Sequence, residues 1–308
     1  MTTLLDMIDE VSMNLSGYTL QQDRATHITA AVAATASTIA APITLSLAST
    51  DSVGKGIIEI DEELFWVDNY DRVGNTATIA PYGRAYLGTT LATHTEGTKV
   101  TIAPTFPRFT IKRAINDTIS AIGSSIFAAK TTTITSNSAA SAFRLPTTGA
   151  TLNISKILAI AYQALGASKE WVPIRTYRFD GNANTTAFTS GQTVSIYDYI
   201  PSGRTVQIVY ATDPVAFTTN ADVFTTVTGL PESCKDLVIL GATYRLLSNL
   251  DPARASMVSP QADEVDSKRP YGSSQTLTRQ IYALFTQRLN EEIRNQQDKY
   301  PIRVHYSL

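Results

Sequence analysis

The sequence predicts an α+β fold in which a helical bundle core is interrupted by two mainly antiparallel β-domains. Four segments, from both ends and the middle of the chain, repeat their apolar residues at helical spacing. The long stretches between them alternate apolar and polar residues and contain Gly and Pro turns, which is typical of short strands. The predicted helical core comprises 1–24, 104–129 and 230–300, with a first β-module at 25–103, a second β-domain at 130–229 and an extended tail at 301–308.

The first predicted helix begins at Thr3, which forms a capping-box pattern with Asp6, and it ends before Gly17. Its apolar residues share one face: Leu4, Leu5, Ile8, Val11 and Leu15. The uncharged segment 25–50 is long enough to raise the question of a membrane span. Because it is mostly Ala, Thr and Ser, its transfer into lipid would gain little, and strands at 26–34 and 38–47 are expected instead.

The stretch 56–107 carries the clearest strand pattern in the chain. Apolar residues alternate there with acidic ones: Ile58, Ile60, Leu64, Trp66 and Tyr70 with Glu59, Asp61, Glu63, Asp68 and Asp71. This alternation predicts half-buried strands with the acids on a solvated face. Acid/base catalysis by Asp61 and Glu63 is the less favoured alternative.

The second predicted helix covers Arg108–Ala128, followed by a segment rich in Thr, Ser and Asn. The helix places five isoleucines at helical spacing: Ile111, Ile115, Ile119, Ile122 and Ile126. Strands are predicted at 131–135, 151–162, 170–180, 193–200, 204–212 and 222–228. Several short strands at this spacing favour a sandwich or a barrel.

The last two predicted helices follow a capping-box pattern at Ser233 and Asp236 and a polar linker at 251–274. The final helix, Gln275–Lys299, has an apolar stripe: Leu277, Ile281, Leu284, Phe285, Leu289 and Ile293. Burying this stripe contributes roughly 10 to 18 kcal/mol, whereas ordering the helix costs on the order of 30 kcal/mol. The helix must therefore share its apolar face, and the other three helices are the expected partners.

Composition and motifs favour a non-enzymatic protein. The charged fraction is 17% and the net charge −2, so the chain has no basic field for nucleic acid. The sequence contains no nucleotide-binding glycine loop and no G-x-S-x-G nucleophile elbow. His27, His94 and His305 lack the spacing of a zinc site, so no metal or cofactor is expected. The N-terminal ten residues carry acids where a secretory signal needs basic residues.

Two further segments have alternative interpretations. Asp180, Asn182 and Asn184 imitate the start of a calcium loop, but Gly191 stands where the last ligand should be, and a hairpin turn is favoured. In the tail, apolar residues alternate with polar ones: Ile302, Val304, Tyr306 and Leu308 with Arg303, His305 and Ser307. Such a segment either frays or adds to the edge of a sheet, in this chain or in a neighbour.

The order of residues from E-x-D-x-E-L-x-x-V, through T-x-x-P-x-G-R-x-x-x-G-T and H-x-x-G-T-x-V, to F-P-R resembles a family of tailed-bacteriophage virion proteins, the head-to-tail connector (adaptor or neck) proteins. The residues that carry it are Glu59, Asp61, Glu63, Leu64, Val67, Thr78, Pro81, Gly83, Arg84, Gly88, Thr89, His94, Gly97, Thr98, Val100, Phe106, Pro107 and Arg108. The resemblance covers roughly 3–128 and 230–308, and it leaves the role of 130–229 open.

The resemblance implies a structural protein without enzymatic activity, which forms a ring, commonly of twelve subunits, and joins the portal of the head to the tail. The implied partners are the portal, the tail or a second neck protein, and DNA that only passes through the channel, with no membrane. The implied location is the virion neck, after assembly in the host cytoplasm. Contacts with the portal or a neighbouring subunit are assigned to the tail: Ile302, Arg303, Val304, His305, Tyr306 and Leu308. The alternative is a tail or baseplate protein whose second β-domain binds a host-surface glycan through Trp171 or Tyr177.

Overall fold

The computed structural model describes residues 2–17, 23–137, 140–145, 153–166, 169–248 and 273–301. The chain forms two compact units, and the four boundaries between them fall inside α1, α2, α4 and α7, whose bounds are given below. Unit 1 comprises Met1–Leu4, Asn116–Val238 and Ala283–Leu308, and unit 2 comprises Leu5–Ile115 and Ile239–Tyr282.

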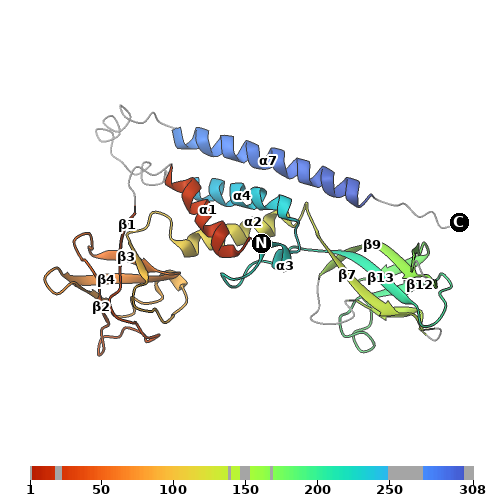
Figure 1. The fold of residues 1–308 in the computed structure, drawn as a ribbon, viewed down its shortest axis with the longest axis horizontal. Coiled ribbons are helices and arrows are strands. Elements are labelled where there is room, and N and C mark those ends of the chain that lie inside the picture. The colour runs from red at the N-terminus through yellow and green to blue at the C-terminus, as the bar shows by residue number, and fades with distance from the viewer. Residues whose placement is uncertain are drawn as a thin grey trace. The chain divides into compact units, whose positions relative to one another are not determined.

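Unit 2 contains a six-stranded antiparallel sheet in the order β1-β6-β3-β4-β5-β2 (Figure 1). The strands are β1 (Arg24–His27), β2 (Thr44–Ser46), β3 (Gly56–Ile60), β4 (Glu63–Asp71), β5 (Thr76–Ile79) and β6 (Lys99–Ile102). One face of the sheet packs on a cluster of buried apolar side chains that includes Ile28, Leu45, Phe65 and Val100. This sheet is the framework on which the first β-module is built.

The β3–β4 hairpin places its acids differently from the prediction. Ile60 lies opposite Glu63 and Ile58 lies opposite Phe65, across a two-residue turn in which Asp61 has a φ of 56°. Directly opposed residues share one face of a sheet, so the inward positions change from even numbers in β3 to odd numbers in β4. Phe65 therefore lies in the core in place of Trp66, and Glu63 points inward, where a solvated edge had been expected.

Unit 1 contains a four-stranded sheet, β10-β9-β13-β7, and a three-stranded sheet, β11-β12-β8, both antiparallel. Their strands are β7 (Ala128–Thr135), β8 (Ala142–Arg144), β9 (Ile154–Gln163), β10 (Trp171–Pro173), β11 (Tyr177–Asp180), β12 (Thr193–Ile196) and β13 (Thr205–Thr212). Side chains from both sheets meet in one core, among them Ile160, Ile208, Val194 and Ile196. The two sheets thus pack face to face.

The strand predicted at 222–228 is wrong, because this segment forms the short helix α3 (Phe224–Thr228). Local hydrogen bonds favour the helical turn over the strand propensity of its threonines. The Asp222 carboxylate accepts bonds from the backbone of Thr218 and Thr219, and the Thr228 hydroxyl donates to the Phe224 carbonyl at 2.7 Å. Gly229, with a φ of 72°, ends the helix in the left-handed conformation that glycine favours.

The four long helices that the sequence predicts are present. They are α1 (Leu4–Ser16), α2 (Arg108–Ile122), α4 (Lys235–Leu247) and α7 (Ser273–Lys299), and η1 (Tyr86–Gly88) and η2 (Glu232–Cys234) are 3-10 turns. Within the described residues, no helix combines the length and the apolar character needed to cross a membrane.

The predicted fold class, a helical bundle core, is nevertheless wrong. The structure is β-rich, with three antiparallel sheets that supply the two large buried clusters described above. The energetic argument for a bundle assumed that the whole stripe of the last helix is buried. In α7 only Ile281 and Phe285 of that stripe are buried, whereas Leu284 is 52% exposed.

Candidate functional site

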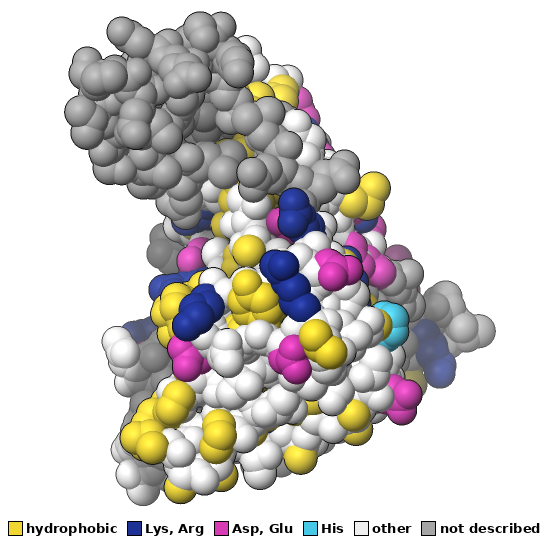
Figure 2. All heavy atoms as spheres, turned by 90° about the vertical axis from the view of Figure 1, so that its left-hand side faces the viewer, with side chains coloured by type: hydrophobic (Ala, Val, Ile, Leu, Met, Phe, Trp, Pro, Cys, Tyr) yellow, Lys and Arg dark blue, Asp and Glu magenta, His cyan; other side chains and the backbone are white. Residues whose placement is uncertain are grey.

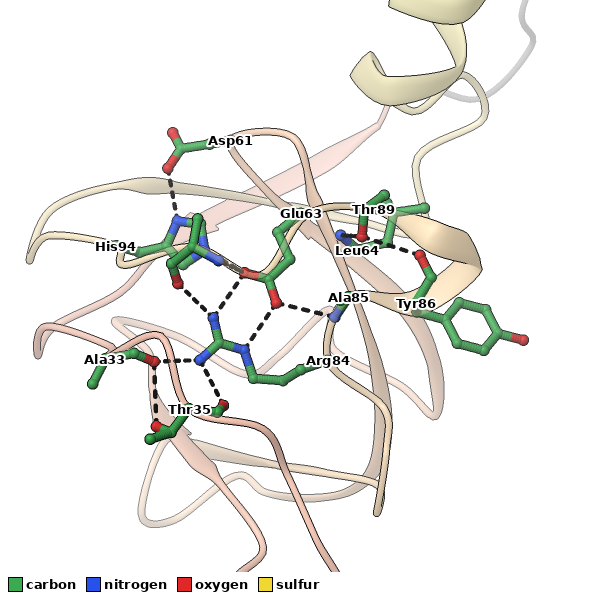
Figure 3. A network of polar contacts seen from close by, with 11 residues as sticks. Ala33, Thr35, Asp61, Glu63, Leu64, Arg84, Ala85, Tyr86, Thr89 and His94 are labelled. Carbon is green, nitrogen blue, oxygen red and sulfur yellow. Dashed lines mark hydrogen bonds and ion pairs between the residues drawn. The ribbon is translucent and has the colours of Figure 1, made fainter.

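Asp61, Glu63, Arg84 and His94, four of the residues that carry the family resemblance, meet in an ion network in unit 2 centred on the Glu63 carboxylate (Figure 3). Oε1 accepts hydrogen bonds from Arg84 Nε at 2.9 Å and from the Ala85 amide at 3.1 Å. Oε2 accepts from Arg84 Nη2 at 2.7 Å and from the Ala92 amide at 3.0 Å. Both the Glu63 and Arg84 side chains are only 1% exposed. A buried bidentate pair of this kind has strong directional preference and holds its partners in fixed positions.

Arg84 extends the network into the loops around the sheet. Its guanidinium donates to the carbonyls of Ala33, Thr35 and Ala92, which come from two segments far apart in the sequence. The same group lies 4.8 Å from the centre of the Phe65 ring, within cation–π range. One side chain therefore ties the backbone of two separate loops to the carboxylate of Glu63.

His94 closes the network on the other side. Its Nε2 lies 3.0 Å from Glu63 Oε2, and its Nδ1 lies 2.7 Å from Asp61 Oδ2. Both ring nitrogens can donate to carboxylates only when the imidazole is protonated. Burial opposes this charge, but the bonds to Glu63 and Asp61 prevail and raise the pKa of His94 above its ordinary 6.5. Burial likewise opposes the charge on Glu63, and the bonds from His94 and Arg84 lower its pKa to about 2.

The network lies beneath a strained loop, 80–89. Tyr82, Ala85 and Leu87 have φ values of 58°, 50° and 55°, in the left-handed region that L-residues rarely adopt. Gly83 is required by a close approach, since a Cβ there would lie 2.9 Å from the carbonyl oxygens of Ala80 and Trp66. Strain of this kind persists only where the surroundings over-determine the backbone, and it often marks functional sites.

The loop presents apolar side chains to solvent. Tyr82 is 73% exposed and Leu87 66% exposed, and the Tyr86 ring packs 5.2 Å from that of Trp66. In Figure 3 the Tyr86 side chain points away from the ion network. Figure 2 shows the side of the molecule where β2, β3 and β4 lie in Figure 1, with exposed hydrophobic side chains among charges of both signs. We call Trp66, Tyr82, Tyr86 and Leu87 the loop surface.

The other face of the sheet is joined to α2 by a second buried acid. Glu59 is 4% exposed, and its Oε1 accepts a hydrogen bond from the Arg108 amide, at the first residue of α2, at 2.5 Å. Burial raises the pKa of Glu59 to about 7, although the bond from Arg108 acts in the opposite direction. Lys112 adds an ion pair with Glu62 at 3.1 Å, so α2 is held to the sheet at two points.

This arrangement is suited to positioning and not to turnover. The charged groups of Glu63 and Arg84 are enclosed, and each is saturated with partners from its own chain. Only Asp61, at 60% side-chain exposure, reaches solvent. Within the described residues, no group of three or more His, Cys, Asp or Glu side chains has the arrangement of a metal site.

The remaining candidates from the sequence have different outcomes. All the tail residues assigned to partner contacts, 302–308, lie outside the described residues. The segment after Asp180 is a hairpin loop between β11 and β12, as predicted, in which the Asp180 and Asn184 side chains accept backbone hydrogen bonds. Cys234 is a buried free thiol, and burial raises its pKa to about 12.

Sequence reasoning missed the network itself. Glu63 and Arg84 are 21 positions apart, and strand alternation gave no reason to pair them. The signal that could have found them is the motif, since Glu63, Arg84, Thr89 and His94 all belong to it. Thr89 takes part as well, because its Oγ1 accepts a bond from the Leu64 amide at 3.1 Å.

Comparison with known proteins supports the resemblance to phage adaptor proteins. No curated protein matches the chain significantly. The family described as SU10 adaptor protein matches residues 84–305, well over half of the chain. The match runs through the second β-domain, which the resemblance read from the sequence had left outside its range. The chain therefore belongs to the SU10 adaptor protein family and is a bacteriophage structural adaptor protein.

Proposed function

We propose that this adaptor assembles into an oligomeric ring in the virion neck and joins the portal of the head to the tail. The observation that carries the proposal is the family match, which includes parts of both compact units. The role is structural and not enzymatic, and DNA passes through the ring without being processed. Twelve copies is the number that the resemblance to connector proteins favours.

The loop surface supports a role in contacts between subunits. Its backbone is held by the Glu63–Arg84 network before any partner arrives, so little conformational entropy is lost on binding. Aromatic side chains at rigid exposed positions are among the residues that dominate interface energies. Tyr82 meets both conditions, and Leu87 adds exposed apolar area in the same loop.

Ring formation is tested by changing this surface. Substituting Tyr82→Asp and Leu87→Asp adds charge to an interface that we expect to be apolar, and native mass spectrometry should then detect monomers in place of a ring. The matched control is Val73→Asp, a change at a 95% exposed turn position in the same β-module. Rings of unchanged size in the double variant would show that this loop does not hold subunits together.

Joining to the head is tested through the tail. We expect a chain without residues 301–308 to give soluble subunits that do not bind portal-bearing heads, because these residues carry the proposed contact. A chain in which 302–308 is replaced by a Gly/Ser segment of equal length is the control for tail length. Normal binding of the truncated chain to heads would exclude the tail contact and leave ring formation open.

Glycan binding is the second candidate, because Trp171 is 41% exposed on β10. Binding on a glycan array that is lost in Trp171→Ala would favour this role. The family match makes the adaptor role the stronger one.

A further inference from the structure

One strand edge of unit 1 is open. β10 pairs with β9 only over Ala161–Gln163, and the Ile174 amide then donates to the Ile160 carbonyl at 2.9 Å. After Ile174 the chain turns away, because the Arg175 amide donates to the Asp198 carboxylate at 2.8 Å. Among the described residues, no strand covers this side of β9 from Ile154 to Ala159.

The other side of β9 is covered by β13. β13 pairs with it from Ile154 to Tyr162, with two register shifts that leave Ser155 and Leu158 without a partner residue. Peptide groups of a strand point alternately to its two sides, so roughly half of the groups between Ile154 and Ala159 face the open edge. Uncovered edges of this kind promote unwanted pairing between molecules, and proteins usually cover them.

A groove of about 570 Å³ runs along this open edge. Polar and apolar atoms contribute about equally to its lining, and its apolar side chains include Ile157, Leu158, Ala159, Pro173, Ile174 and Tyr177. Lys156 and Arg175 are the charged residues among the described lining, which contains no acid. A groove with apolar side chains, beside a strand edge that no described strand covers, is the arrangement that receives an extended peptide.

The chain itself leads into this groove. Tyr300 and Pro301, the last described residues after α7, line it. The Tyr300 ring packs on Phe127 at 5.9 Å, and the Lys156 ammonium lies 4.5 Å from the centre of the same Phe127 ring. The polypeptide therefore reaches the groove at the end of β9 where Lys156 lies.

The next seven residues, IRVHYSL, have the alternating pattern of a strand with one apolar face. Seven extended residues span roughly 23 Å, and the open part of β9 spans about 20 Å. With Ile302, Val304 and Tyr306 toward the groove, Arg303 and His305 would lie on the opposite side, away from Lys156.

We propose that in the free subunit residues 302–308 add to the open edge of β9 in the same chain. The segment starts beside Lys156, runs parallel to β9 toward Ala159, and continues over Pro173 and Tyr177. Main-chain hydrogen bonds supply the affinity, and the apolar residues of the lining select the alternating side chains. The covalent link through Pro301 makes the docking intramolecular, which raises the effective concentration of the segment. The inference concerns the subunit before assembly and goes beyond the proposed ring.

Disulfide trapping tests whether residues 302–308 dock at the open edge of β9, and whether they do so within their own chain. Val304→Cys combined with Ala159→Cys should oxidise to an intrachain disulfide with an effective concentration at least tenfold above that of the control pair. The control pairs Val304→Cys with Thr133→Cys, an exposed position on β7, which β13 separates from β9. Two cysteines can be joined only if their Cα atoms lie within about 7 Å. Cys234 remains as a buried, unreactive thiol.

Equal oxidation of the two cysteine pairs would overturn the proposal. If only covalent dimers formed, the segment would dock on another chain, and docking within the same chain would be refuted. Amide exchange gives a second measurement on the full chain. The amides of 156–159 should exchange at least tenfold faster when the chain ends at Pro301, and a free IRVHYSL peptide should restore their protection. Unchanged exchange would refute the docking. Neither measurement uses heads or rings, so either result leaves the proposed function to its own tests.

Discussion

The Glu63→Gln substitution should cost the first β-module a large part of its stability. Five N–H groups converge on the Glu63 carboxylate: two from Arg84, one from His94, and the amides of Ala85 and Ala92. The glutamine amide keeps one acceptor oxygen, and its NH₂ group then faces donors. Arg84 would remain as a buried charge without its counter-charge, for which the expected cost is about 3 to 5 kcal/mol.

The pKa of Glu63 gives a second value for the contribution of this carboxylate to the free energy of unfolding. A carboxyl whose pKa falls from 4.5 to about 2 on folding contributes about 3 kcal/mol. Because the folded pKa is depressed, this contribution is present above pH 4.5 and is lost as the pH falls toward 2. Both magnitudes assign the effect to the charged hydrogen bonds of Glu63 and not to the shape of its side chain.

The chain provides a local fluorescence probe for this experiment. Trp66 lies in unit 2 and Trp171 in unit 1, so in a Trp171→Phe background denaturant unfolding followed by fluorescence reports on the first β-module. Glu96→Gln, at an exposed position of the same module, is the control and should change the free energy of unfolding by less than about 0.5 kcal/mol.

A double-mutant cycle tests whether the Glu63–Arg84 ion pair is the cause of the lost stability. Arg84→Met added to Glu63→Gln removes the second charge, so the double variant should be less destabilised than the sum of the single ones. Additive effects, or a loss below about 1 kcal/mol for Glu63→Gln, would refute the assignment of this network as the support of the loop.

Three further predictions concern the same unit. The pKa of Glu59 is raised on folding, so its contribution to the free energy of unfolding is fully present below pH 4.5 and is lost as the pH rises through about 7. In wild type this loss should reach about 3 kcal/mol when unfolding is measured across that pH range, and Glu59→Gln should abolish it. The pKa of His94 is also raised, so its contribution to stability is fully present below pH 6.5 and is lost at higher pH. An NMR titration, with the His94 signal assigned by use of His27→Gln and His305→Gln, should give a midpoint above 6.5. A lower midpoint would contradict a protonated His94 in the network. Gly83→Ala should destabilise the module by about 1 to 3 kcal/mol, because the new Cβ meets two carbonyl oxygens at 2.9 Å, and an unchanged denaturation midpoint would show that the loop can move.

The sequence predicted helices and strands better than it predicted the faces they bury. Apolar spacing located α1, α2, α4 and α7, because a helical period is a local property of the chain. The inward face of β4 depends on the two-residue turn at Asp61 and Glu62. That turn moves the buried positions from even residue numbers in β3 to odd residue numbers in β4. Glu63 was therefore assigned to solvent although it lies at the centre of the candidate site.

Competition between local and distant partners explains the other failures. The Thr-rich segment at 224–228 has strand propensity, but the Thr228 hydroxyl donates to the Phe224 carbonyl within the helical turn, and Gly229 ends it in the left-handed conformation. The stripe of α7 has the pattern of a buried helix, yet only Ile281 and Phe285 of it are buried, and the strands form cores of their own. Periodicity identifies which residues are able to be buried, and it does not identify the surfaces that compete for them.

The motif that led to the adaptor family describes a shape more than a chemistry. Glu63, Arg84 and His94 bind one another and the backbone, while Gly88, with a φ of 81°, and Gly83 permit turns that other residues would strain. The most exposed side chains of the loop surface, Tyr82 and Leu87, lie between these motif positions and outside the pattern. Under the proposed function, a partner would contact residues that take no part in the buried network, on a backbone that this network fixes. Specificity for a particular neighbour can then change without loss of the loop, which is the property that a modular adaptor requires.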